Sequence, residues 1–315
     1  MEAIKKMNEP FKGHLALLAT NIIFGANASI SKLLLIDHMN AYALSLIRML
    51  SATALFWGAS FFAKREKIER KDFFMLFLAS IFGILLNQGL FVIGLSKTSP
   101  IDAILLETLT PVMTMIIAAL YLKEPITFKK AIGVIIGCSG AVLLILRENH
   151  SQSGISSNMW GNILVLISGL AYATYFAVFI KIVKKYSPIT VMKWMFLFSS
   201  IICTPFWFKD IMLIDFTQFS TQASLQLSFT IVFATFLTYL MLPIGQKRLR
   251  PTIVSMYIYC QPIVVTIVSI MLGVGSFSWD KVLATVLIFI GVYVVTQSKS
   301  RQQVLEEQEK LKTNP

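Results

Sequence analysis

The sequence predicts an all-α integral membrane protein with ten transmembrane helices arranged as two inverted five-helix repeats. Three observations support this prediction: the composition is strongly apolar, ten segments are long enough to cross a bilayer, and the two halves of the chain align. Of the 315 residues, 56% are hydrophobic and only 14% are charged, and the mean hydropathy is +0.72. A water-soluble domain of ordinary composition is less apolar. The composition therefore indicates a protein whose main solvent is lipid.

Ten apolar segments have the length that a membrane span requires. A bilayer core of about 30 Å needs about 20 helical residues, because the buried backbone groups must be satisfied within the helix. In the first half the predicted spans are Gly13 to Leu35, Ala41 to Ala63, Phe73 to Leu95, Pro100 to Leu122 and Phe128 to Leu146. In the second half they are Trp160 to Ile182, Pro188 to Phe208, Leu225 to Gly245, Pro251 to Leu272 and Trp279 to Thr296.

The basic residues give the orientation. With ten spans, 21 Lys and Arg residues fall in the termini and the even-numbered loops, against only Lys97, Arg147 and Lys209 in the odd-numbered loops. Cytoplasmic loops of membrane proteins carry the excess of Lys and Arg. We therefore expect a multi-pass protein of the cell membrane with both termini in the cytoplasm. The net charge of +12 is explained by this pattern, so we expect no nucleic acid partner.

The two halves align at a shift of about 150 residues. Gly94, Pro100 and Pro111 fall on Gly245, Pro251 and Pro262, and near the start Gly13 meets Gly161 at a slightly shorter shift. An odd number of spans per half makes the second half begin on the opposite side of the membrane, so the repeats are inverted, which is typical of transporters. The expected domains are a cytoplasmic N-terminus (1–12), the first repeat (13–146), an external linker (147–159), the second repeat (160–297) and a cytoplasmic tail (298–315).

The first half carries a distinctive set of residues, which are Arg48, Gly94, Leu95, Pro100, Ala103, Pro111, the run Leu122 to Thr127, Gly133, Gly137 and Gly140. This set resembles the pattern of the drug/metabolite transporter superfamily, specifically its EamA-type permeases. In the second half the pattern departs, since Gly275 stands where a repeat of Glu124 would be expected. Small residues such as these glycines also allow close packing of membrane helices.

The resemblance implies a secondary transporter of small metabolites, and we expect an exporter of amino acids or similar amphipathic compounds that works by alternating access of the two repeats. Related branches suggest an alternative, a nucleotide-sugar or sugar-phosphate exchanger. A channel or a non-transporting membrane scaffold is the alternative of another class, which saturable, competitive flux would exclude. The sequence leaves the oligomeric state open, with a homodimer as one option.

An enzyme is not expected. No His-Glu-x-x-His, paired Asp or Gly-x-Ser-x-Gly motif occurs, and no phosphate-binding Gly-x4-Gly-Lys-[Ser/Thr] loop occurs that would suggest direct use of ATP. The three cysteines lack paired spacing, and the three histidines lie at or outside the ends of the spans. We therefore predict no metal site and no cofactor.

The predicted substrate site lies near mid-membrane. Pro111 and Pro262 fall close to the centres of the fourth and ninth spans, where each should kink its helix. Polar groups facing lipid cost free energy, so polar residues at this level should face the bundle interior. The candidate substrate-binding residues are Asn27, Asn87, Gln88, Thr110, Pro111, Tyr172, Tyr175, Tyr239, Tyr257, Gln261 and Pro262, and Thr235 lies at the same level.

Two charged residues lie deeper than the rest. Arg48 and Glu107 are each the eighth residue from the outer end of a span, which places both at a depth of about 10 Å. We predict that they form an ion pair or meet through the substrate, with Lys32 as a third member. A structural pair and a role for Glu107 in carrying a coupling proton both fit this spacing.

Overall fold

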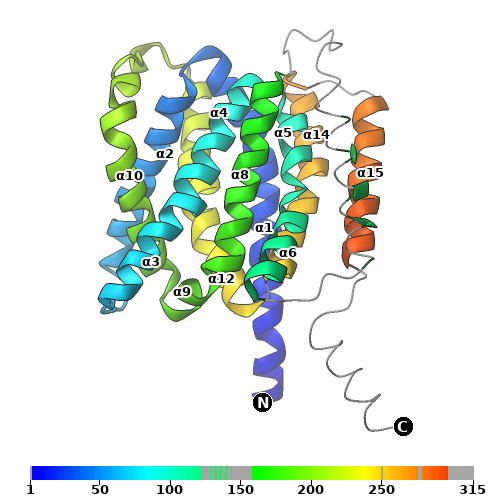
Figure 1. The fold of residues 1–315 in the computed structure, drawn as a ribbon. Coiled ribbons are helices and arrows are strands. Elements are labelled where there is room, and N and C mark those ends of the chain that lie inside the picture. The colour runs from blue at the N-terminus through cyan, green and yellow to red at the C-terminus, as the bar shows by residue number, and fades with distance from the viewer. Residues whose placement is uncertain are drawn as a thin grey trace.

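The computed structural model describes residues 2–122, single residues and short stretches between 128 and 143, and residues 158–249, 251–275 and 279–296. Within these ranges, every regular element is helical. Eight helices are long and apolar enough to cross a membrane, and they stand side by side in one bundle (Figure 1). The predicted all-α membrane fold is confirmed.

The helices follow the predicted spans closely. The first half contains α1 (Glu2–Asp37), α2 (Ala41–Ser60), the continuous run of α3 (Arg70–Ser80), η1 (Ile81–Gly89) and α4 (Leu90–Lys97), and then α5 (Pro100–Glu107) and α6 (Thr110–Leu122). The second half contains α8 (Met159–Val178), α9 (Ile180–Lys185), α10 (Pro188–Met212), η3 (Phe216–Gln218), the run of α11 (Thr221–Ser228), η4 (Phe229–Leu237) and α12 (Thr238–Arg248), the run of α13 (Pro251–Met256), η5 (Tyr257–Cys260) and α14 (Gln261–Met271), and α15 (Trp279–Thr296). Most of the predicted fifth span lies outside the described residues.

Serine followed by proline starts two of these helices. Ser99 precedes α5 and Ser187 precedes α10, and each side chain accepts a hydrogen bond from the backbone N–H three residues further on. Such a serine satisfies one of the free N–H groups of the first turn, while proline at the first helical position gives up no hydrogen bond. The local sequence therefore sets where the chain leaves a loop and enters the next helix.

The two halves pack on each other through α2 and α10. Phe56 and Phe196 are fully buried in this contact, and their rings stack with centroids 5.6 Å apart. The hydroxyls of Thr53 and Ser200 lie 2.9 Å apart in the same contact. Aromatic burial and an interhelical hydrogen bond thus join the first repeat to the second.

The inverted repeat is visible in matched helix contacts. Gly94 of α4 faces Gly161 of α8, and a Cβ atom added at Gly94 would lie 2.7 Å from the carbonyl oxygen of Gly161. In the other half, Gly245 of α12 packs against the side chain of Leu17 in α1 and likewise leaves no room for a Cβ atom. In both cases the third span of one half packs on the first helix of the other. The glycines that align in the sequence therefore occupy equivalent contacts in the fold.

Candidate functional site

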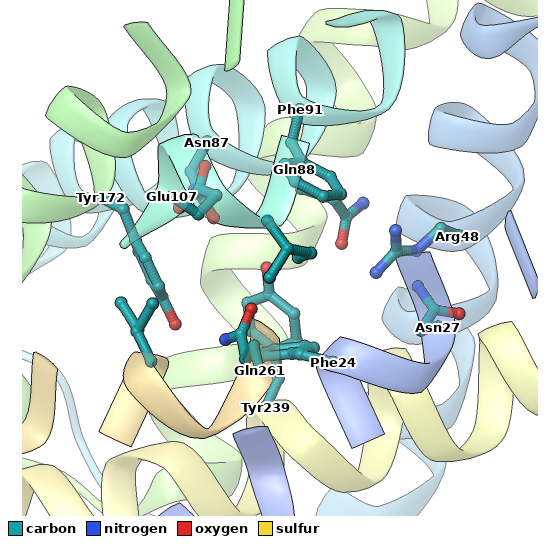
Figure 2. Close-up of a pocket in the computed structure, with 12 residues that line it drawn as sticks. Phe24, Asn27, Arg48, Asn87, Gln88, Phe91, Glu107, Tyr172, Tyr239 and Gln261 are labelled. Atoms are coloured by element: carbon teal, nitrogen blue, oxygen red, sulfur yellow. The ribbon is translucent and has the colours of Figure 1, made fainter. Parts of the chain in front are cut away.

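A cavity lies between helices of both halves. Its walls come from α1, α2, η1, α4 and α5 of the first half and from α8, α12, η5 and α14 of the second. The lining residues are Phe24, Asn27, Arg48, Asn87, Gln88, Phe91, Ile104, Glu107, Tyr172, Tyr239, Ile258 and Gln261 (Figure 2). A ligand in this cavity would contact both repeats at once.

Both helices with predicted kinks are interrupted beside the cavity. The fourth span breaks between Glu107, the last residue of α5, and Thr110, the first residue of α6. The ninth span passes through the short 3-10 helix η5 before α14 begins at Gln261. Pro111 and Pro262 each come one residue after the new helix starts, because proline lacks an N–H group and clashes with the carbonyl of the preceding turn. The breaks bring Glu107 and Gln261 to the cavity wall.

Arg48 of α2 is buried and held by the second repeat. Its Nε donates to the hydroxyl of Thr235 at 2.9 Å, and its Nη2 donates to the carbonyl oxygen of Ala234 at 3.4 Å. Only 3% of the residue is exposed. Figure 2 shows the guanidinium beside Asn27 on one side of the cavity. A buried cation held by two neutral oxygens is a strong attractor for an anionic group.

Glu107 lies on the opposite side of the cavity from Arg48, together with Asn87 and Tyr172 (Figure 2). The hydroxyl of Ser168 donates to Oε1 of Glu107 at 2.6 Å, and the hydroxyl of Thr110 donates to Oε2 at 3.2 Å. Both partners are neutral. The carboxyl group is therefore oriented toward the cavity without a cation at hydrogen-bond distance among the described residues.

The direct ion pair predicted between Arg48 and Glu107 is absent from the described hydrogen bonds and salt bridges. Equal depth along two helices fixes only the position across the membrane, and here the width of the cavity separates the two side chains (Figure 2). The other prediction, that the two charges meet through a substrate, stays a prediction.

Lys32 does not join these two charges, which corrects its predicted place as a third member. Its ammonium group donates to the carbonyl oxygens of Leu95, Ser96 and Thr98 at 2.9, 3.1 and 2.9 Å, where α4 ends. The last carbonyls of a helix lack intrahelical partners and carry partial negative charge. Lys32 thus ties α1 to the end of α4, away from the cavity.

Two amide side chains in the cavity wall are incompletely satisfied within the described part of the chain. Both amide atoms of Gln88 and Oδ1 of Asn27 are buried there without a hydrogen-bond partner. Gln88 is 3% exposed and Asn27 is 4% exposed. Buried polar atoms in native proteins are nearly always paired. Because these atoms line a cavity, a polar ligand or water is the partner that the site can accept.

Tyr172 and Tyr239 add aromatic rings to the cavity wall, and both pack on further rings. The rings of Tyr172 and Tyr175 are parallel, with centroids 6.1 Å apart. Tyr239 meets Phe24 and Phe196 edge to face, with centroids 6.0 and 5.0 Å away. Such rings can pack on apolar groups and attract cationic ones.

Several predicted site residues lie outside the cavity wall. Thr110 orients Glu107, and Tyr175 donates its hydroxyl proton to Gln246 at 3.4 Å behind Tyr172. The hydroxyl of Tyr257 forms a hydrogen bond with His14, which lies in α1 nearer to its N-terminus than the lining residues Phe24 and Asn27. Pro111 and Pro262 shape the helices without lining the space.

The structure also adds four lining residues that sequence reasoning missed: Phe24, Phe91, Ile104 and Ile258. An apolar residue in an apolar helix carries no signal that separates a cavity wall from a lipid-facing surface. Only their position one turn from a predicted polar residue, as for Phe24 and Asn27, could have indicated them.

Comparisons with other proteins found relatives of this chain and solved structures with a similar fold. It is 25% identical to an uncharacterized inner membrane transporter, YicL, of Salmonella typhimurium, with 94% of this chain and 99% of that protein covered. It is 24% identical to the WAT1-related protein At5g07050 of Arabidopsis thaliana, with 92% and 81% covered. A solved structure described as a crystal structure of a protein superposes with a TM-score of 0.61 at 16% identity, covering 92% of this chain and 97% of the other. That last likeness supports the fold alone.

The family comparison agrees with the two halves seen in the fold. The model of the EamA-like transporter family matches twice, over residues 11–146 and over residues 159–297. The two matches together cover most of the chain. The protein therefore belongs to the EamA-like transporter family and is a multi-pass membrane transporter of small molecules.

Proposed function

We propose that the protein exports amino acids or similar amphipathic metabolites by alternating access of its two five-helix repeats. The observation that supports this substrate class is the separation of charge in the central cavity. Among the described residues that line it, Arg48 is the one basic residue and Glu107 the one acidic residue, and they lie on opposite sides (Figure 2). A ligand that carries both charges would complete the site.

A zwitterion suits this arrangement chemically. Its carboxylate would accept hydrogen bonds from Arg48 and from the unpaired amide of Gln88, and its ammonium group would donate to Glu107. Burying each ligand charge against an opposite one offsets the large cost of removing it from water. The rings of Tyr172 and Tyr239 would pack on the apolar part.

The nucleotide-sugar or sugar-phosphate alternative fits the cavity less well. Such substrates carry phosphate groups with up to two negative charges each, which proteins bind with several Arg, Lys or backbone N–H donors. Here one arginine would have to serve them, and the carboxyl group of Glu107 would lie close to the phosphates. Like charges at close range destabilise a complex. The cavity therefore favours a substrate with no net charge.

Inverted repeats support a carrier in preference to a channel or a scaffold. When the two halves exchange conformations, a cavity open to one side becomes open to the other. The equivalent contacts of α4 with α8 and of α12 with α1 are the kind of paired interface that such an exchange uses. A channel or a non-transporting scaffold has no need of this symmetry.

We place the protein in the cell membrane with both termini in the cytoplasm, on the distribution of Lys and Arg, and we take residues 13–146 and 160–297 as the moving repeats. Glu107 is the group that could carry a coupling proton, because it is a carboxyl group oriented into the cavity by neutral hydroxyls.

A thermal-shift screen tests the substrate class. The purified protein in detergent would be heated with L-amino acids, nucleotide sugars, sugar phosphates and cationic drugs, since a ligand that binds only the folded state raises the unfolding temperature by mass action. We expect a dose-dependent rise with amino acids that Arg48→Gln abolishes. Lys193→Gln, a change at a basic residue that does not line the cavity, should keep it. A rise with nucleotide sugars alone would replace this proposal with the alternative.

A further inference from the structure

The third span of each repeat contains a segment of π-helix. Each is nine residues long, and they are η1 (Ile81–Gly89) between α3 and α4, and η4 (Phe229–Leu237) between α11 and α12. Both therefore lie within the third span of their half. π-helical turns are rare in proteins, and those that do occur are often found at functional sites. Their occurrence in the same span of both repeats indicates a shared task.

In η4, the seventh residue is Thr235, which holds Arg48. Its hydroxyl donates to the carbonyl oxygen of Thr230, five residues earlier, at 2.7 Å and accepts a hydrogen bond from Nε of Arg48 at 2.9 Å. The neighbouring Ala234 carbonyl accepts from Nη2 of Arg48. The wide turn thus presents a hydroxyl and a carbonyl oxygen to a cation from the other repeat.

In η1, the seventh residue is Asn87, and it acts on the other charged group. Its amide nitrogen donates to the backbone carbonyl oxygen of Ser168 in α8 at 3.3 Å. The hydroxyl of the same Ser168 donates to Glu107 at 2.6 Å. Here again the π-helical residue reaches across the interface between the repeats, and it holds the backbone that carries the partner of the carboxyl group.

We propose that Thr235 and Asn87 are positioning residues, each of which uses its π-helical turn to set the place of one charged group in the cavity. Thr235 positions Arg48 directly, and Asn87 positions Glu107 through Ser168. A π-helical turn holds one more residue than an α-helical turn, so its conversion to α-helix would rotate the following residues by about 100° relative to the preceding ones. That change would withdraw the positioning side chain and release the charged group.

This inference deepens the transport function proposed above, because it concerns the same cavity, but its test needs no substrate. In a background without the native cysteines, Asn27→Cys would report on the surroundings of Arg48 and Tyr172→Cys on those of Glu107 (Figure 2). The probes are an anionic and a cationic methanethiosulfonate reagent. The ratio of their reaction rates measures the local electrostatic potential, and a change in access alone leaves that ratio unchanged.

Thr235→Val should lower the anionic-to-cationic ratio of reaction rates at Asn27→Cys about tenfold. This is the effect of moving the charge of Arg48 from about 6 to about 8 Å from the reacting thiol at an effective dielectric constant of about 20, counted once for each of the two oppositely charged reagents. Thr235→Ser keeps the hydroxyl and should keep the ratio. The matched control is Thr53→Val, which removes the bond to Ser200 but does not touch Arg48. Asn87→Leu should change the ratio at Tyr172→Cys and leave the ratio at Asn27→Cys as it was.

Equal changes for Thr235→Val, Thr235→Ser and Thr53→Val would overturn the proposal, because a general loosening of the bundle would then explain them. A second measurement is a double-mutant cycle on the unfolding temperature of the purified protein. If Thr235 acts through Arg48, Thr235→Val should add nothing to Arg48→Met. Additive losses would mean that the two residues are independent. Neither result depends on whether amino acids are the substrate.

Discussion

At the residue scale, three of the buried charged residues described in the first repeat are stabilised in three different ways. Arg48 uses a hydroxyl and a carbonyl oxygen of η4, Glu107 uses two hydroxyls, and Lys32 uses three carbonyl oxygens at the end of α4. A charge inside a membrane is costly unless it is paired or hydrated. Of these three residues, Arg48 and Glu107 line the cavity and Lys32 does not, so we expect Lys32 to matter for stability and the other two for function.

Lys32→Met should destabilise the protein without changing its ligand preference. The substitution leaves the carbonyl oxygens of Leu95, Ser96 and Thr98 without the ammonium group, and the loss of charge-assisted bonds in a buried site should cost roughly 3 kcal/mol. Thermal unfolding in detergent measures this loss. Lys193→Met serves as the control, because the ammonium group of Lys193 lies over the ring of Trp57 at 5.1 Å, a contact worth less than about 1 kcal/mol when exposed. Equal losses in both variants would contradict the assigned role of Lys32.

Glu107→Gln separates proton coupling from substrate binding. Glutamine keeps an oxygen that accepts the bond from Ser168 but cannot release a proton. If Glu107 carries the coupling proton, the variant should lose accumulation driven by a pH gradient and keep the exchange of labelled for unlabelled amino acid in proteoliposomes. Transport with an unchanged pH dependence would exclude the coupling role.

The polar part of the site could be predicted from the sequence, since Asn27, Gln88 and Gln261 are conspicuous in apolar spans and must find polar surroundings. The partners of each residue could not be predicted. The carbonyl oxygens that hold Lys32 belong to the backbone, and the separation of Arg48 from Glu107 depends on helix rotation, which depth does not fix.

At the element scale, breaks in helices shape the cavity. The interruptions before Pro111 and Pro262 were predictable, because proline cannot continue the hydrogen-bond ladder of a helix. The π-helical segments η1 and η4 were not, since their residues, such as Phe229 and Leu237, are ordinary for an apolar helix. The backbone conformation there depends on packing between the repeats.

Pro111→Ala and Pro262→Ala should impair transport while leaving stability unchanged or higher. Alanine supplies the missing N–H group and favours a continuous helix, which would draw Glu107 or Gln261 out of the cavity wall. Proteoliposome uptake and thermal unfolding would be measured on the same preparations. Pro205→Ala is the matched control, because Pro205 lies inside α10 and does not line the cavity. Full transport by both variants would show that the breaks are not needed.

At the scale of the whole molecule, contacts between the repeats occur at both ends of the bundle. At the end predicted to face the cytoplasm, Lys185 forms salt bridges with Asp72 at 2.5 Å and Glu69 at 2.8 Å. These bonds, first to Asp72 and then to Glu69, hold the pKa of Lys185 above its usual value. At the other end, the amide of Asn40 donates to Asp210 at 2.6 Å. The repeats are therefore joined by salt bridges at one end of the bundle and by a hydrogen bond from a neutral amide at the other.

The overall architecture was the most predictable feature. The alternation of basic loops follows from how each span is oriented in the bilayer. The glycines shared between the halves, such as Gly94 and Gly245, follow from the close packing of helix backbones. The substrate was the least predictable, because it depends on which side chains converge in one cavity.

The most direct test of the central claim is counterflow of labelled amino acids in proteoliposomes that contain the purified protein. The proposed function predicts saturable uptake that unlabelled amino acids compete away. It also predicts that Arg48→Gln and Glu107→Gln raise the half-saturating concentration, while Lys193→Gln does not. Flux that is linear in concentration would indicate a channel. Saturable flux that is indifferent to both cavity substitutions would show that the substrate binds elsewhere.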